Sequence, residues 1–470
     1  MKKNSLFKIL ATTMIVIALL TWLIPSGYFS GEFVDAGITR LGFVDFCQYL
    51  ILPFFQSMFL EVLVFLLSVG AFYGVLSKTG AYNNLIGKIA KKFKKKGNLF
   101  LIVTACIIAL LSSFGGYGLL LFIFIPALIS IILLMGYDKI VALLTTFGAA
   151  LIGVIGTTFG VSYISQTLSA LDLVDGSRLL FTSQILFKVI LLVLSLVILI
   201  IFTLKYANKN KVKNSVEDIP YLGKEDSKKK STGLYIIFGI IFVLFILGCT
   251  NWNDAFGIEI FTNFHTWVTE ISIAKFKIFN YLLGSSAAEL GTWSYFQMSI
   301  ILVIASLIIS KIYKVKAFES MIEGIKEIIK PALLIIFAYG ILILTVNSGM
   351  FNTIISFFTT EKFNALGVTI SMILTIVASF LHIELSYVGS FVLPYISSGF
   401  TETIVPAIMN IMSQSLYGLT MFVAPTSLLL ILGLTYLDIP YNEWLKKVWK
   451  LVAALFLLIV VIIIIMMLVL

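Results

Sequence analysis

Residues 233–250 read GLYIIFGIIFVLFILGCT, a run of eighteen residues without a charged side chain. A helix of about this length crosses the hydrocarbon core of a bilayer. The apolar residues are continuous and do not alternate with polar ones, so the pattern favours a helix over a strand of a membrane barrel. This stretch therefore predicts a transmembrane helix.

Similar apolar blocks recur along the whole chain. Of its 470 residues 60% are hydrophobic and 12% are charged, with a mean hydropathy of +1.08. A soluble domain needs more charge to cover its surface, so we predict an all-α polytopic membrane protein. We expect residues 6–25 to form a membrane anchor rather than a cleaved signal peptide. The nine predicted spans are 6–25, 57–77, 139–172, 181–204, 233–250, 295–313, 331–350, 404–438 and 448–470.

The net charge of +10 is concentrated in four lysine-rich stretches, which are Lys88–Lys96, Lys205–Lys230, Lys311–Lys316 and Lys446–Lys450. Loops rich in lysine face the cytoplasm. The placement predicts a multi-pass protein of the cell membrane with a cytoplasmic N-terminus and an external C-terminus. The excess charge is therefore explained by orientation in the lipid bilayer and does not indicate a nucleic-acid partner.

Two apolar stretches, 99–135 and 366–399, are each long enough for two helices but return to the side where they start. We interpret both as re-entrant hairpins. Each half then repeats one order of elements with opposite topology, which is the inverted-repeat plan of secondary transporters; chance similarity between apolar sequences is the alternative. The predicted parts are a first repeat at 1–204 (surface helix 41–56, hairpin 99–135, broken helix 139–172), a basic linker at 205–232, a connecting span and external loop at 233–294, and a second repeat at 295–470 (surface helix 315–330, hairpin 366–399, broken helix 404–438).

Four clusters of Gly, Ser, Thr or Pro interrupt these apolar stretches, two in each half. Interrupted helices free backbone groups and helix ends that bind ions and substrates, although small residues also let two membrane helices pack closely. The predicted substrate-binding residues are Ser112, Ser113, Gly115, Gly116, Tyr117, Thr157, Thr158, His382, Glu384, Ser386, Tyr387, Ser390, Pro425, Thr426 and Ser427.

Ionisable residues within membrane segments are costly and are candidates for function. Glu384 and His382 lie in the third cluster, and Glu61 lies near the start of a span. The chain lacks nucleotide-binding and hydrolase motifs, and three cysteines in or beside apolar segments provide no metal site. We therefore expect no enzyme activity, no metal and no cofactor, with Na⁺ coupling, H⁺ coupling and pure exchange all open.

Several short motifs resemble the YfcC-type carriers of the ion transporter superfamily, which also contains C4-dicarboxylate anaerobic carriers and arginine–ornithine antiporters. The resemblance implies two inverted repeats with hairpins and broken helices, and such carriers are often homodimers. The motifs are Thr21-Trp22-Leu23-Ile24-Pro25-Ser26-Gly27, Met135-Gly136-Tyr137-Asp138, Phe147-Gly148-Ala149, Gly156-Thr157-Thr158, Phe318-x4-Glu323-Gly324-x-Lys326-Glu327, Pro331-Ala332-Leu333, Ala424-Pro425-Thr426-Ser427 and Ile439-Pro440-Tyr441-x-x-Trp444.

The first hairpin tip departs from the family pattern, because Ser113-Phe114-Gly115-Gly116-Tyr117 replaces its usual acidic residues, and Glu384 is found at the second tip instead. One carboxylate at a tip suits a cationic amino group, so the leading hypothesis is a secondary transporter of an amino acid such as arginine or ornithine. A carrier of dicarboxylates or short-chain carboxylates is the alternative; the four clusters contain no Arg or Lys. A membrane-embedded enzyme is a more distant third.

Overall fold

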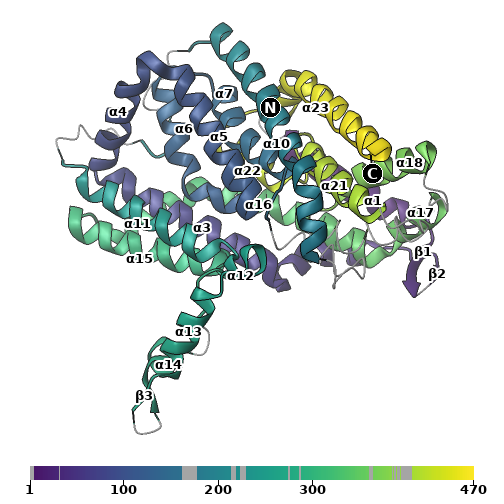
Figure 1. The fold of residues 1–470 in the computed structure, drawn as a ribbon, viewed down its shortest axis with the longest axis horizontal. Helices are drawn as coiled ribbons and strands as arrows, with labels where there is room; N and C mark the ends of the chain where they lie inside the picture. Colours follow the sequence, from purple (N-terminus) through teal and green to yellow (C-terminus); the bar gives the residue numbers. More distant parts are fainter. Residues whose placement is uncertain are drawn as a thin grey trace. The chain divides into compact units, whose positions relative to one another are not determined.

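The computed structural model describes residues 5–30, 32–160, 177–212, 219–222, 229–273, 276–284, 287–358, 364–383, 385, 388, 392 and 405–469. These residues are almost entirely helical, with two short strand hairpins (Figure 1). The chain divides into two compact units. The first comprises Met1–Leu60, Phe93–Ser215 and Ile329–Leu470, and the second comprises Glu61–Lys92 and Val216–Ile328.

The first unit contains both interrupted stretches. Its β1 and β2 pair antiparallel, and β1 packs against α17, where the Asn352 side chain donates to the carbonyl of Gly27 at 3.0 Å. Its elements are α1 (Ser5–Leu20), β1 (Ser26–Ser30), β2 (Glu32–Gly37), α2 (Phe43–Ile51), α5 (Gly97–Gly115), α6 (Ile125–Leu134), α7 (Lys139–Leu143), α8 (Ala149–Ile155), α10 (Ser177–Lys209), α17 (Met350–Phe358), α18 (Ala365–Leu381), α21 (Val405–Thr420), α22 (Leu428–Tyr436) and α23 (Tyr441–Val469).

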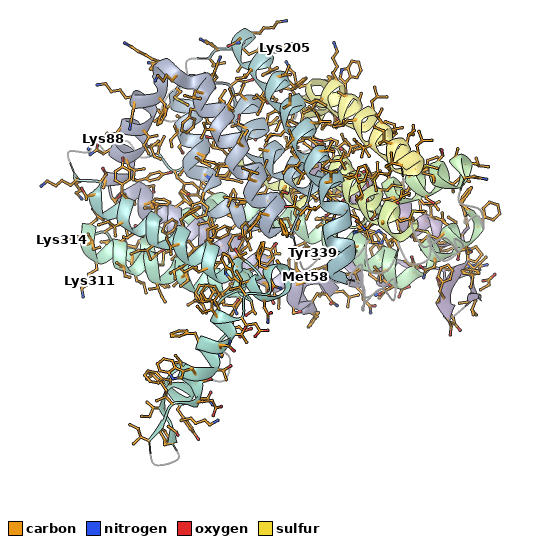
Figure 2. The ribbon with its side chains drawn as sticks, viewed as in Figure 1. Met58, Lys88, Lys205, Lys311, Lys314 and Tyr339 are labelled. Carbon is orange, nitrogen blue, oxygen red and sulfur yellow. The ribbon has the colours of Figure 1, made fainter. Side chains whose placement is uncertain are left out.

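The second unit contains the connecting span and its loop. There α13, α14 and β3 form an extension beyond α12 (Figure 1). Lys88, Lys311 and Lys314 are exposed and point away from the ribbon (Figure 2), as expected of residues outside lipid. The elements are α4 (Ala81–Phe93), α11 (Thr232–Cys249), α12 (Trp252–Phe256), α13 (Ile260–Glu270), β3 (Ser272–Ile273), β4 (Phe276–Lys277), α14 (Ile278–Leu283) and α15 (Tyr295–Tyr313), while α3 (Ser57–Lys78) and α16 (Ala317–Ser348) contribute residues to both units.

The membrane class is confirmed by helix length and composition. Among the described residues, seven helices are long and apolar enough to cross a membrane. They are Ser57–Lys78, Ala81–Gly115, Gln184–Lys209, Thr232–Cys249, Tyr295–Tyr313, Ala317–Ser348 and Tyr441–Val469.

This set differs from the nine predicted spans for identifiable reasons. The predicted spans 139–172 and 404–438 contain breaks, so neither yields one long helix, and α1 has only 16 residues. The predicted surface helix 315–330 and span 331–350 form a single helix, α16, which continues through Pro331. A proline inside a helix removes one backbone hydrogen bond, and in membrane helices neighbouring groups compensate for this loss.

Two predicted interruptions are present as helix ends. The stretch from Lys139 to Ile155 is helical, with a π-helical turn at Leu144–Gly148, and it stops at Gly156. In the second half α21 stops at Thr420 and α22 begins at Leu428. The remainder of 139–172 and much of 366–399 lie outside the described residues. The inverted repeat, both hairpins and the predicted part boundaries stay predictions.

In the second unit, glycines allow α3 and α16 to touch through their backbones. A Cβ on Gly324 would lie 2.1 Å from the carbonyl oxygen of Gly70 and 2.5 Å from the Cα of Gly74. The same contact is extended by the buried Tyr221, whose hydroxyl donates to the carbonyl of Gly324 at 3.1 Å. This crossing is therefore of the small-residue type that brings membrane helices together.

We expect Gly324→Ala to destabilise the protein, because the added methyl group overlaps the backbone of α3. The expected loss is about 1–3 kcal/mol, seen as a lower Tm of the purified protein in detergent. Gly239→Ala is the matched control, because Gly239 lies in α11 with no atom within 4 Å of an added Cβ. An unchanged Tm for Gly324→Ala would contradict the observed helix contact.

Candidate functional site

The two predicted breaks of the first half lie against each other. Ser113 lies in the last turn of α5. Its Oγ donates to the carbonyl of Gly156 at 2.6 Å and lies 3.1 Å from Oγ1 of Thr158. The backbone N–H of Thr158 donates to the carbonyl of Ser113 at 3.0 Å. The preceding residue, Ser112, donates to the carbonyl of Ala150 at 2.8 Å. These hydroxyls therefore hold the end of α8 against the end of α5.

The glycines of the first cluster shape the turn after α5. Gly116 has φ +65°, a left-handed conformation that favours glycine, and it ends the helix. Its Cα approaches that of Gly160, and an added Cβ on Gly115 would overlap the ring of the buried Tyr117. Thr157 donates to the carbonyl of Val154 at 3.0 Å, within its own helix end. The predicted residues of this half thus come together, mainly through bonds to backbone.

The second half shows the same kind of contact between its two breaks. Thr426 donates from Oγ1 to the carbonyl of Phe380 at 2.7 Å, and the Tyr417 hydroxyl donates to the carbonyl of Ile383 at 2.7 Å. Ser427, two residues after Pro425, caps α22 by accepting from the N–H of Leu430. A break region of α21–α22 therefore lies against the end of α18.

His382 follows α18 and is buried. Its Nδ1 lies 2.7 Å from the carbonyl of Ala378, and its ring contacts that of Phe351 with 5.6 Å between centroids. Four other predicted binding residues, Glu384, Ser386, Tyr387 and Ser390, lie outside the described residues. Glu61 accepts a hydrogen bond from the Ser294 hydroxyl at 3.3 Å in the second unit. All these binding assignments stay predictions.

One of the sequence motifs has a structural role at the second break. It is Ile439-Pro440-Tyr441-x-x-Trp444. Trp444 is buried, and its Nε1 donates to the carbonyl of Phe422 at 2.8 Å. The Tyr441 hydroxyl donates to the carbonyl of Val423. Carbonyl groups at a helix end have no partner within the helix, and an unpaired carbonyl is costly in an apolar interior. Two aromatic donors at the start of α23 therefore pair backbone carbonyls that this break would otherwise leave without a hydrogen bond.

Helix α21 also brings polar side chains of the second half to the first break. Gln414 is buried, and its Nε2 donates to the carbonyls of Ile155 at 3.3 Å and Thr157 at 3.2 Å. One turn later Gly418 lies against the backbone of Ile155, which an added Cβ would approach to 2.7 Å. The end of α8 is therefore surrounded by residues from both halves of the sequence.

Lys188 of α10 is a functional candidate that the sequence analysis overlooked. It is 1% exposed although it lies in a strongly apolar helix, and Gln184, one turn before it, accepts from Nδ2 of Asn410 at 3.1 Å. One turn after it, the backbone of Leu192 lies against Gly156. We call Gln184, Lys188, Asn410 and Gln414 the buried polar cluster. A lysine inside the predicted span 181–204 was the available signal.

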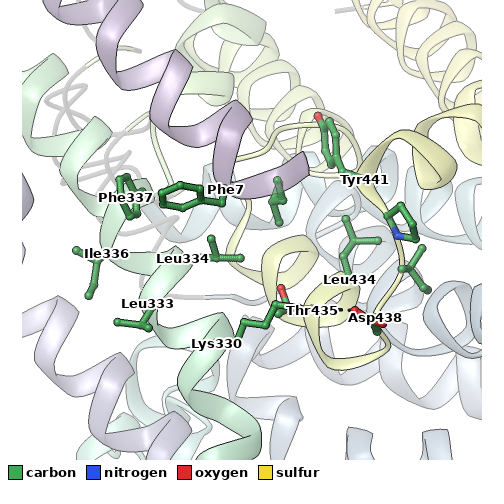
Figure 3. Close-up of a pocket in the computed structure, with 13 residues that line it drawn as sticks. Phe7, Lys330, Leu333, Leu334, Ile336, Phe337, Leu434, Thr435, Asp438 and Tyr441 are labelled. Carbon is green, nitrogen blue, oxygen red and sulfur yellow. Dashed lines mark ion pairs between the residues drawn. The ribbon is translucent and has the colours of Figure 1, made fainter. Parts of the chain in front are cut away.

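A cavity of about 550 Å³ in the first unit is separate from these residues. Its walls are mostly apolar, the rings of Phe7 and Phe337 meet edge to face at 5.1 Å, and Lys330 pairs with Asp438 at 3.7 Å (Figure 3). None of the predicted binding residues lines it. Among the described residues there is also no group of three His, Cys, Asp or Glu side chains that would hold a metal ion.

Long apolar helices, two breaks enclosed by neighbouring helices and a buried polar cluster are features of membrane transport proteins. A family model described as DcuC, C4-dicarboxylate anaerobic carrier, matches residues 4–469. The chain therefore belongs to the C4-dicarboxylate anaerobic carrier family, and it is a multi-pass membrane transporter rather than an enzyme.

Two further comparisons gave more distant similarities. An uncharacterized protein of Haemophilus influenzae is 25% identical over 411 residues, which cover 84% of this chain and 73% of that protein. Among solved structures, the Alcanivorax borkumensis YdaH transporter aligns with 13% identity and a TM-score of 0.41, over 98% of this chain and 97% of that one.

We expect Trp444→Phe to destabilise the second break, because phenylalanine keeps an aromatic ring but leaves the carbonyl of Phe422 without its donor. The expected cost is about 1–3 kcal/mol, measured as a lower Tm in detergent. Trp449→Phe, on the exposed side of the same helix, is the control and should change Tm little. Equal Tm values for the two variants would contradict a structural role for the indole N–H.

Proposed function

We propose that this protein is a secondary transporter that carries C4-dicarboxylates or related small carboxylates across the cell membrane by alternating access. The observation that carries the proposal is the family match over residues 4–469. Neither this match nor the other similarities favour arginine or ornithine, the leading hypothesis from sequence. The carboxylate alternative is therefore the better supported of the two.

The geometry supports transport through a site built around the first break. Three elements surround the end of α8: the end of α5 through Ser113, α10 through Leu192, and α21 through Gln414. Broken helices provide backbone groups and helix ends for a substrate without requiring charged side chains at the break itself. In this proposal the substrate lies beside the Gly156–Thr158 break and contacts groups from both halves of the sequence.

Several finer features belong to the same proposal. The two inverted repeats would supply the two arrangements needed for alternating access, with the hairpins 99–135 and 366–399 reaching the substrate from opposite sides. The resemblance to YfcC-type carriers and the lysine distribution support this plan and a cytoplasmic N-terminus. Transport coupled to Na⁺, transport coupled to H⁺ and pure exchange are to be distinguished by experiment. The resemblance to YfcC-type carriers also implies a homodimer.

The decisive test is uptake of labelled succinate into proteoliposomes that contain the purified protein. We expect uptake well above protein-free liposomes, with inhibition by unlabelled fumarate or malate and none by arginine. Parallel liposomes loaded with succinate, with buffer alone, or with an imposed Na⁺ or H⁺ gradient identify the coupling mode. Labelled arginine is the second substrate, with ornithine inside the liposomes. Arginine transport without succinate transport would overturn the proposal in favour of the cationic amino-acid hypothesis.

A further inference from the structure

The cavity shown in Figure 3 takes no part in the proposed transport site. Its volume of about 550 Å³ lies within the range of about 300–1,000 Å³ that is typical of sites for small molecules. Four elements form its wall: the start of α1, the middle of α16, the end of α22 and the start of α23. Among the described residues that line it, Lys330 and Asp438 alone are charged. The cavity is therefore apolar with one charged pair.

The charged pair lies where apolar membrane segments begin. Lys330 directly precedes the charge-free run 331–348, which as a helix is about 27 Å long and so nearly matches the hydrocarbon core of a bilayer. Asp438 precedes α23, whose charged residues end at Lys450, before the charge-free run 451–469. The two side chains are 53% and 44% exposed. We therefore expect the pair to lie at the level of the lipid headgroups.

From this pair the cavity extends along the apolar part of α16. Leu334 and Phe337 follow Lys330 by one and two turns of the helix, inside the charge-free run, and both line the cavity (Figure 3). Phe7 and Leu333 also line it and are 44% and 54% exposed, although both are large and apolar. Exposed apolar side chains on a membrane protein face lipid. The cavity is therefore accessible to an acyl chain from the surrounding bilayer.

The geometry of the ion pair leaves room for a headgroup. Nζ of Lys330 and Oδ1 of Asp438 are 3.7 Å apart, which is too long for a direct hydrogen bond. A half-exposed pair of this kind contributes little to stability, so separating its members costs little. The two opposite charges side by side match a zwitterionic headgroup, with a phosphate at Lys330 and an ammonium group at Asp438. An anionic headgroup without an amine would place its negative charge beside the carboxylate of Asp438.

We propose that this cavity binds one acyl chain of a phospholipid with a zwitterionic, amine-bearing headgroup, whose phosphate pairs with Lys330 and whose ammonium group pairs with Asp438. Tyr441 also lines the cavity, and its hydroxyl donates to the carbonyl of Val423 at the second break. The bound lipid fills the space beside this donor and so stabilises the junction of α22 and α23. The inference is independent of which substrate the protein carries.

The first test compares three lipids with identical acyl chains on the delipidated wild-type protein in detergent. They are phosphatidylethanolamine, phosphatidylcholine and phosphatidylglycerol, and native mass spectrometry measures the affinity of the first bound lipid while Tm reports its effect on stability. We expect phosphatidylethanolamine to bind about fivefold more tightly than phosphatidylglycerol and to raise Tm most. Phosphatidylcholine should be intermediate, because its quaternary ammonium group has no N–H to donate to Asp438. Equal affinities for the three lipids would overturn the headgroup assignment.

Substitutions then locate the lipid. Leu334→Trp fills the cavity, so we expect it to lose the tight lipid and the lipid-dependent rise in Tm. Leu307→Trp is the matched control, because Leu307 is 51% exposed on α15 and does not line the cavity. A Leu334→Trp protein that binds the lipid as tightly as wild type would show that the cavity is not the site.

The charged pair is tested separately and does not depend on whether Leu334→Trp folds. Lys330→Gln should weaken phosphatidylethanolamine binding about fivefold, whereas Asp438→Asn should abolish the preference over phosphatidylglycerol. Lys314→Gln, an exposed lysine that does not line the cavity, should behave as wild type. Unchanged lipid preference in both Lys330→Gln and Asp438→Asn would overturn the inference. None of these measurements involves transport, so their failure would leave the proposed function intact, and absence of dicarboxylate uptake would leave the lipid site intact.

Discussion

The constraint on which this structure depends is that the bilayer offers no water to an interrupted helix. Each backbone group released at a break needs a partner from the protein. The structure meets this need with side-chain donors: Ser113 for the carbonyl of Gly156, Thr426 for that of Phe380, and Trp444 for that of Phe422. The positions of α5 and α23 follow from these bonds, because each of these helices places a donor at a break, whereas α18 is held through its Phe380 carbonyl by the donor that Thr426 provides.

This requirement gives the hydroxyls and aromatic donors at the breaks a structural role. Glycine, serine and threonine clusters in membrane helices predict either a binding site or close packing. In the described part of the first half, Ser112 and Ser113 both donate to backbone carbonyls, so their hydroxyl protons already have partners. Under the proposed function, polar contacts to a substrate would then come from the helices beside the break, namely α10 and the body of α21.

Hydropathy predicted the helices well and their junctions less well. The span 295–313 coincides with α15, and 233–250 differs from α11 by one residue at each end, because uninterrupted apolar runs of the right length have no alternative in lipid. The continuity of α16 through Pro331 was missed, since a proline's effect depends on neighbouring helices. Lys188 was inside a correctly predicted span, yet one charge among many apolar residues leaves the span's hydropathy high. Its burial depends on which side of α10 faces α21, and that is a property of the packed structure.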